Sequence, residues 1–197
     1  MDETPWPVIA SEVEYDTGWY TGGYDRVEQP DGSQKDYYWA ALAPAVVVVP
    51  ITDNKEVVFV RQYRPTIQES QYELPAGIVD EHDGRAIDTV PADTYEAAAR
   101  RELREETGYT ADRVTTIQRH AVATGVLRHR RGIVVAEGLD PGPTDRDQNE
   151  FLSVERVPAA DAIKTARAAP ANDATIGGLL LAAADGYVPQ NEDQTTL

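Results

Sequence analysis

Two glutamates, Glu102 and Glu106, stand four residues apart in the most informative segment of the chain, residues 97–109. In a helix this spacing stacks both carboxylates on one face. Like charges at that spacing repel and weaken an isolated helix, so the pair needs an explanation. A hard divalent cation supplies one, because Mg2+ binds carboxylate oxygens and keeps waters for substrate phosphates. The alternative is a solvated acidic helix face in a chain that is acidic throughout.

The residues around this pair predict the helix that must carry it. Arg101 and Glu105 form a neighbouring row at the same spacing, and Gly108 marks the helix end, because glycine tolerates the left-handed conformation found there. At the other end, Asp93 and Glu96 have the spacing of a capping box. The alternative role of Asp93 is to orient Arg101. The segment therefore predicts a helix that begins near Asp93 and stops at Gly108.

The order of residues from position 73 to position 109 resembles the signature of the Nudix hydrolases. That signature runs Gly-x5-Glu-x7-Arg-Glu-(apolar)-x-Glu-Glu-x-Gly-(apolar), and its second half matches residues 101–109 without a gap. Glu-Leu-Pro-Ala-Gly at residues 73–77 precedes it. Two features depart from the pattern: Asp93 replaces the first glutamate, and about ten extra residues lie between Gly77 and Asp93. A surface loop absorbs such an insertion at little entropic cost.

The remaining segments predict an α/β protein. Residues 45–51 form a continuous apolar, β-branched run, which is typical of a strand buried on both faces. Strand-like runs alternate with helical stretches up to residue 184, and the resemblance implies a Nudix α/β/α sandwich with a mixed sheet. A small antiparallel β segment precedes it. We expect this segment at residues 1–42, the Nudix hydrolase domain at residues 43–190 and a polar tail at residues 191–197.

The resemblance also implies which residues hold a metal ion. Glu102 and Glu106 match the metal-binding glutamates of the family, and Glu105 would contribute directly or through a water. The carbonyl of Ala76 matches a backbone ligand, because the glycine after it lets the loop approach closely. Arg101 would keep the carboxylates in register through charge-assisted hydrogen bonds. The expected cofactor is Mg2+, with Mn2+ as the alternative.

Within the superfamily the chain looks most like the ADP-ribose pyrophosphatases. That resemblance implies Mg2+-dependent hydrolysis of ADP-ribose to AMP and ribose 5-phosphate, with a general base in the acidic loop 144–150. Glu150 is the first candidate for this base and Asp147 the second. The alternatives are a Nudix hydrolase for another nucleotide sugar or a dinucleotide, and a non-catalytic nucleotide sensor with the same fold. The intact glutamate cluster disfavours the sensor.

Several arginines and aromatic residues are candidates for substrate binding, and most of them have an alternative role. Arg61 and Arg64 suit diphosphate recognition, and Glu73 would bind a ribose hydroxyl or pair with Arg64. Trp19 and Tyr37 match aromatic positions that clamp adenine in related dimeric enzymes; alternatively they pack the N-terminal segment. The basic run from Arg128 to Arg131 would grip a phosphate or steer an anionic substrate, or form ordinary salt bridges.

The composition of the chain limits the kinds of partner that it can bind. The 197 residues carry a net charge of −16, which argues against nonspecific nucleic-acid binding. There is no cysteine, no apolar run long enough to span a membrane, and an acidic N-terminus unlike a signal peptide. We therefore expect a cytoplasmic protein that acts on a small nucleotide, and the family resemblance implies a homodimer. Abundant carboxylate with scarce lysine suggests adaptation to concentrated salt.

Overall fold

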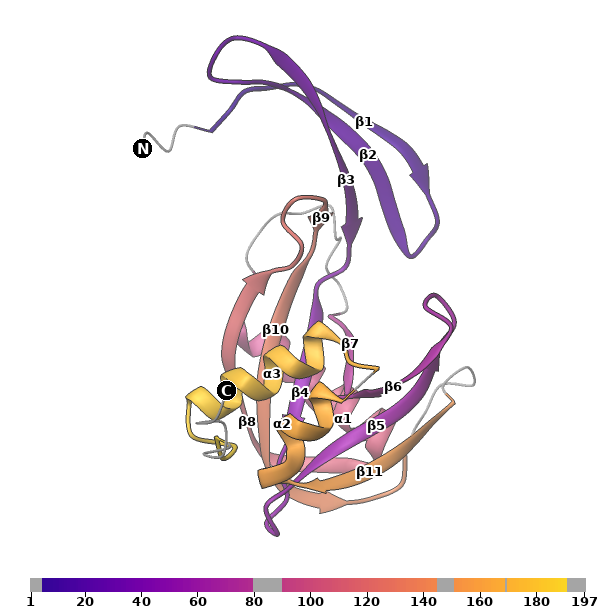
Figure 1. Ribbon diagram of the computed structural model, residues 1–197, viewed down its shortest axis with the longest axis vertical. Coiled ribbons are helices and arrows are strands. Elements are labelled where there is room, and N and C mark those ends of the chain that lie inside the picture. Colours follow the sequence, from indigo (N-terminus) through magenta and orange to yellow (C-terminus); the bar gives the residue numbers. More distant parts are fainter. Residues whose placement is uncertain (1–4, 80–89, 145–150, 169, 191–197) are drawn as a thin grey trace. The chain divides into compact units, whose positions relative to one another are not determined.

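The computed structural model describes residues 5–79, 90–144, 151–168 and 170–190 (Figure 1). The chain divides into two compact units. Among the described residues, the first unit comprises residues 5–44 and 120–130. The second comprises residues 45–79, 90–119, 131–144, 151–168 and 170–190.

The first unit is a four-stranded sheet in the order β1-β2-β3-β9. Its strands are β1 (Val8–Asp16), β2 (Tyr20–Glu28), β3 (Gln34–Leu42) and β9 (Leu127–Arg128). The first three form an antiparallel meander, which confirms the predicted N-terminal β segment. The short β9 pairs in parallel with β3 and comes from much later in the chain, which the sequence reading did not anticipate. Strand β1 is exposed along its whole length.

The second unit contains two sheets, with strand orders β7-β4-β10-β8 and β11-β5-β6. The first comprises β4 (Ala45–Pro50), β7 (Ala76–Ile78), β8 (Tyr109–Ala121) and β10 (Arg130–Pro141). The second comprises β5 (Glu56–Arg64), β6 (Glu69–Glu73) and β11 (Leu152–Pro158). Strand β4 pairs in parallel with β10 and antiparallel with β7, so this sheet is mixed, as expected.

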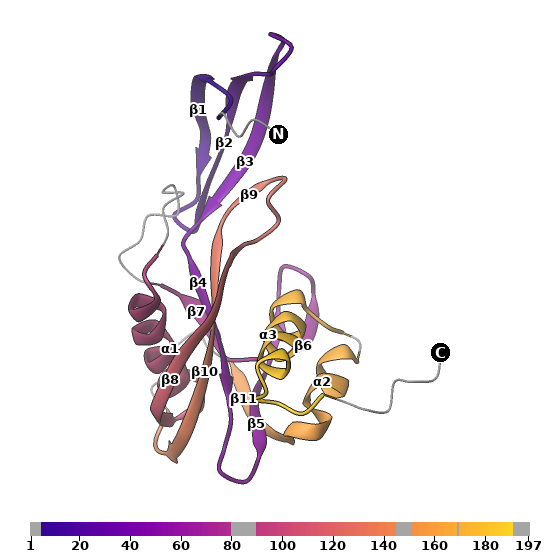
Figure 2. The same ribbon diagram turned by 90° about the vertical axis from the view of Figure 1, so that its left-hand side faces the viewer.

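The second unit has three helices among its described residues: α1 (Ala92–Thr107), α2 (Ala159–Arg167) and α3 (Asp173–Ala184). Helices α1 and α3 contact β4 of the mixed sheet, whereas α2 packs on β5, β6 and β11. Figure 2 shows α1 on one side of β4 and β10, with α2 and α3 on the other. Successive side chains of β4 point to opposite faces of the sheet, and this explains the layering. Val46 and Val48 pack in the core beneath α1, whereas Val47 and Val49 pack in the core that contains α2 and α3. The expected α/β/α arrangement is confirmed.

The two ends of α1 differ in how well they were predicted. Gly108 ends the helix at φ 78°, in the left-handed region, as the sequence indicates. The capping box is wrong: the helix begins after Pro91 without a side-chain cap. Glu96 instead accepts a hydrogen bond from the backbone N–H of Thr116 on β8, at 3.0 Å. The Glu96 carboxylate therefore binds a backbone N–H of strand β8 and does not cap the N-terminus of the helix.

The described helices include none that could cross a membrane, because none combines sufficient length with sufficient apolar character.

Candidate active site

The loop that leads into β7 lies against α1 at the two glutamates singled out above. Glu102 is 6% exposed and Glu106 is 4% exposed, so neither belongs to a solvated helix face. A Cβ atom at Gly77 would overlap the carboxylate of Glu102, so a side chain there would displace that carboxylate. Glu106 accepts a hydrogen bond from the backbone N–H of Ala76 at 3.3 Å. Two buried carboxylates thus meet the backbone of one tight loop.

These groups fit a divalent cation. Burying carboxylates without compensation is costly, and a cation is one way to offset that cost. Across the described ranges, no cluster of three or more His, Cys, Asp or Glu side chains could hold a metal ion by itself. A cation here would therefore need oxygen ligands from the backbone or from water in addition to the carboxylates, and Mg2+ accepts such a mixed set.

Arg101 connects the helix to the same loop. Its guanidinium lies 2.8 Å from Glu102 and 3.0 Å from Glu105. It also donates a hydrogen bond to the carbonyl of Ile78 at 2.8 Å. One guanidinium therefore bridges two carboxylates and the backbone after Gly77. The expected role of Arg101, to keep the carboxylates in register, stays a prediction.

The close approach at Gly77 leads to a prediction. Gly77→Ala places a methyl group where the Glu102 carboxylate lies, so the side chain must move. We expect affinity for Mg2+ to fall by about tenfold to a hundredfold, as when supporting groups of metal ligands are lost. Isothermal titration with Mg2+ measures this loss. Gly177→Ala is the matched control, because a Cβ there meets no atom within 4 Å. Equal Mg2+ affinity in both variants would contradict the expectation.

Arg64, which is partly exposed, pairs with the buried Glu73 near Glu106. The Arg64 guanidinium donates to both carboxylate oxygens of Glu73, at 3.0 and 3.1 Å from Nε. Gln62 donates to the same carboxylate at 2.9 Å. The hydrogen bonds that Arg64 donates to Glu73 hold the pKa of Arg64 above its ordinary value, although burial opposes this, and the charges of Glu73 and Glu106 add to the effect. Of the two roles considered for Glu73, the structure shows the pairing with Arg64.

Strand alternation separates Arg61 from Arg64, although the sequence reading grouped them. Gln62 and Arg64 lie on the face of β5 that carries Glu73, whereas Arg61 faces the other way and contacts the ring of Tyr72. The same alternation identifies a residue that the sequence reading missed. Gln71 shares the face of Glu73, is 2% exposed, and its Oε1 has no hydrogen-bond partner. Period-two alternation along residues 69–73 is the signal that could have found it.

The remaining predicted substrate residues lie in the first unit. Trp19 is 83% exposed at the turn between β1 and β2, so it does not pack that segment. Tyr37 contacts Trp6 edge-on, with ring centroids 6.4 Å apart. Arg128 pairs with Asp25, and its guanidinium lies 3.9 Å from the centroid of a Trp39 ring.

The structure describes part of the basic run, residues 128–131, but not the two candidate bases in the acidic loop. Arg131 pairs with Asp173 at 2.8 Å, so both it and Arg128 are engaged in salt bridges, in line with the second interpretation of the basic run. Asp147 and Glu150, the two candidates for the general base, lie outside the described residues. Their assignment stays a prediction.

Comparison with known proteins agrees with this geometry. The sequence model of the NUDIX domain family matches residues 41–176 of this chain. An ADP-ribose pyrophosphatase from Bacillus subtilis (strain 168) is 30% identical over 152 residues, which cover 76% of this chain and 77% of that protein. The ADP compounds hydrolase NudE from Escherichia coli (strain K12) is 29% identical over 116 residues, or 59% of this chain and 56% of the relative.

The fold agrees as well. A crystal structure of an ADP compounds hydrolase matches with a TM-score of 0.75 at 22% sequence identity, covering 93% of this chain and 97% of that one. The family match includes the loop at Gly77 and the whole of α1, where the buried glutamates lie. The chain therefore belongs to the Nudix hydrolase family.

Proposed function

We propose that this protein hydrolyses the pyrophosphate bond of a nucleoside diphosphate sugar, with ADP-ribose as the substrate and AMP and ribose 5-phosphate as products. The observation that carries this proposal is the pair of buried carboxylates, Glu102 and Glu106, against the loop at Ala76 and Gly77. The similarity to the ADP-ribose pyrophosphatase of Bacillus subtilis supports the choice of substrate.

Nudix hydrolases generally use a divalent metal ion, and we propose Mg2+ for this one, held by Glu102, Glu106 and the carbonyl of Ala76. When bound, Mg2+ neutralises charge on the phosphoryl oxygens and favours ionisation of a water. Arg101 keeps Glu102 and Glu105 oriented toward the loop. Arg64, fixed by Glu73 and Gln62, presents its guanidinium to the diphosphate.

Glu150 acts as the general base in this proposal, with Asp147 as the alternative. The base accepts a proton from the attacking water, whose oxygen forms a bond to one phosphorus. The bond from that phosphorus to the bridging oxygen breaks, and the bridging oxygen leaves on the other phosphate. An acidic group other than the metal ligands suits this role, because a carboxylate bound to a cation is a weak base.

A substrate panel tests the proposal. ADP-ribose, another nucleotide sugar and a dinucleotide are each incubated with the protein and Mg2+, and the products are identified by chromatography. We expect kcat/KM for ADP-ribose to exceed the others by at least about tenfold, or about 1.4 kcal/mol. The broader name of the Escherichia coli relative, an ADP compounds hydrolase, favours ADP-containing compounds as the second choice. Tight binding of ADP-ribose without turnover would instead support a sensor.

The N-terminal segment, residues 1–42, is proposed to form a homodimer and to supply Trp19 and Tyr37 to the adenine. Large apolar side chains are exposed across this unit, including Trp6, Val8, Val13, Trp19 and Tyr38. Exposed apolar patches of this kind mark interaction surfaces. Strand β1 of the same unit is exposed at every residue.

Light scattering should give twice the monomer mass of 21.6 kDa. Trp19→Ala should raise KM for ADP-ribose about tenfold with little change in kcat, since stacking on a base contributes roughly 1–3 kcal/mol. Because Trp19 is exposed, its loss should leave the fold intact. A strict monomer with full ADP-ribose activity, unaffected by Trp19→Ala, would overturn both the dimer and the role of this residue.

A further inference from the structure

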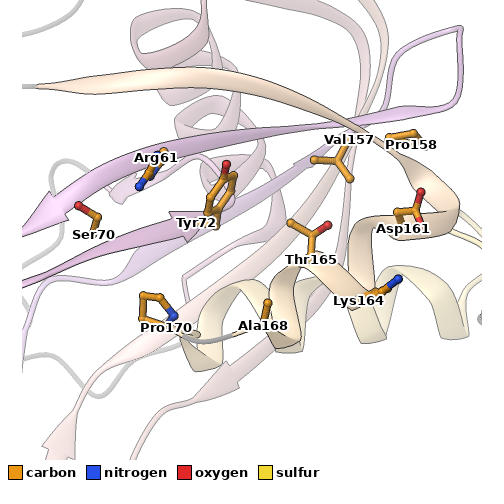
Figure 3. A pocket seen from close by; sticks show the side chains of 10 residues that line it. All are labelled: Arg61, Ser70, Tyr72, Val157, Pro158, Asp161, Lys164, Thr165, Ala168 and Pro170. Atoms are coloured by element: carbon orange, nitrogen blue, oxygen red, sulfur yellow. The ribbon is translucent and has the colours of Figure 1, made fainter.

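A cavity of about 710 Å³ lies between the sheet β11-β5-β6 and helix α2 (Figure 3). Its size falls within the range typical of small-molecule sites. Arg61 and Tyr72 line it from the sheet, on the face opposite to Arg64 and Glu73. A ligand in this cavity would therefore lie across the strands from the proposed active site.

Arg61 is the cation that distinguishes this cavity. Its guanidinium lies 5.6 Å from the centroid of the Tyr72 ring. The hydroxyl of Tyr72 donates a hydrogen bond to Glu155 at 2.5 Å, which holds the ring and occupies that carboxylate. Within the described parts of the chain, Arg61 forms no ion pair. Other arginines do: Arg26, Arg64, Arg101, Arg113, Arg128 and Arg131. In a chain of net charge −16, this cavity thus presents an arginine whose charge is not paired with a carboxylate among the described residues.

The rest of the lining suits an anion with an apolar body. Ser70 lies on the same face of β6 as Tyr72 and adds a hydroxyl donor near Arg61. On α2, Lys164 and Thr165 border the cavity, with Asp161 one turn earlier. Asp161 offsets part of the charge of Lys164, so Arg61 provides the dominant attraction. Apolar walls complete the cavity, formed by Val157, Pro158, Ala168 and Pro170.

We propose that this cavity is a second binding site, for a small organic phosphate whose phosphate group binds Arg61 beside Ser70. The planar guanidinium presents two parallel N–H donors to phosphate oxygens, and the ring of Tyr72 fixes its plane. The organic body lies along the apolar wall between β11 and α2. Lys164 strengthens the attraction from the far side of the cavity.

Phenyl phosphate is a suitable probe, because it combines one phosphate with a compact apolar ring. Its binding to the full-length protein is measured by ligand-observed NMR, with EDTA present so that metal-dependent binding at the glutamates does not contribute. We expect saturable binding that weakens at least about tenfold in Arg61→Gln, since hydrogen bonds to charged groups are the stronger ones. Lys164→Gln should weaken binding less, by about threefold, because a solvated charge is screened.

Two matched variants control for loss of positive charge alone. Arg156→Gln removes an exposed arginine of β11 outside the lining, and Arg167→Gln removes one from the end of α2. Both should bind phenyl phosphate as the unaltered protein does, and thermal denaturation verifies that each variant folds.

Three outcomes would overturn the proposal: no saturable binding up to concentrations on the order of 10 mM, unchanged affinity in Arg61→Gln, or equal weakening in Arg61→Gln and Arg156→Gln. Because the assay contains no metal and measures no turnover, these outcomes are independent of the proposed hydrolysis.

Discussion

Glu106→Gln is expected to lower kcat by about a thousandfold while leaving the protein folded. Glutamine has nearly the same shape, and its amide oxygen can still accept the hydrogen bond from the backbone of Ala76. What it removes is a negative charge in a buried position, where a metal ligand contributes several kcal/mol to transition-state stabilisation. Steady-state kinetics with ADP-ribose across a Mg2+ titration measure the loss, and circular dichroism verifies the fold.

Glu105→Gln is the matched control, because it makes the same substitution one residue away on α1. The Glu105 side chain is more exposed than that of Glu106 and pairs with Arg101, so its loss should cost only about tenfold. Glu102→Gln should behave like Glu106→Gln. Near-normal activity of Glu102→Gln or Glu106→Gln at saturating Mg2+ would show that the metal assignment is wrong.

Glu150→Gln is expected to lower kcat by about 10²–10⁴-fold, the usual contribution of a general base. The Mg2+ dependence of the remaining activity should stay unchanged, because a base acts on the attacking water and not on ground-state metal binding. Single-turnover kinetics at several Mg2+ concentrations separate the two effects.

Asp147→Asn is the paired variant, since both carboxylates belong to the loop at residues 144–150. We expect a smaller effect for it than for Glu150→Gln. A larger loss of kcat at Asp147 would transfer the role of base to that residue. Loss of Mg2+ affinity in Glu150→Gln would assign Glu150 to the metal site instead.

The elements that depend on local sequence were predictable. The valine run of β4 and the end of α1 at Gly108 follow from alternation and from the conformational freedom of glycine. The capping-box prediction failed because a second backbone group competes for the same carboxylate. Glu96 has the spacing of a capping group, yet its carboxylate bonds to β8, which lies beyond the helix in the chain. Sequence spacing cannot indicate which of two backbone groups a carboxylate will satisfy.

The site shows the same division. The glutamate pair could be read from helical spacing, whereas its burial against Gly77 depends on how the loop and α1 pack. Arg61 and Arg64 looked equivalent because both are arginines on one strand. Their spacing of three residues places them on opposite faces of the strand at residues 56–64, which the sequence already indicates. What the sequence does not show is which face carries Glu73, because that depends on the pairing of β5 with β6.

The late origin of β9 has a consequence for how the protein is made. The first three strands of the N-terminal sheet leave the ribosome early, but β9 begins at Leu127, 85 residues after β3 ends at Leu42. At a synthesis rate of roughly 5–20 residues per second, this interval lasts on the order of 5–20 s. Throughout it, β3 has no strand on the side where β9 will pair, and an open strand edge invites pairing with other chains. Translation speed between residues 42 and 127 therefore sets how long each nascent chain carries that open edge.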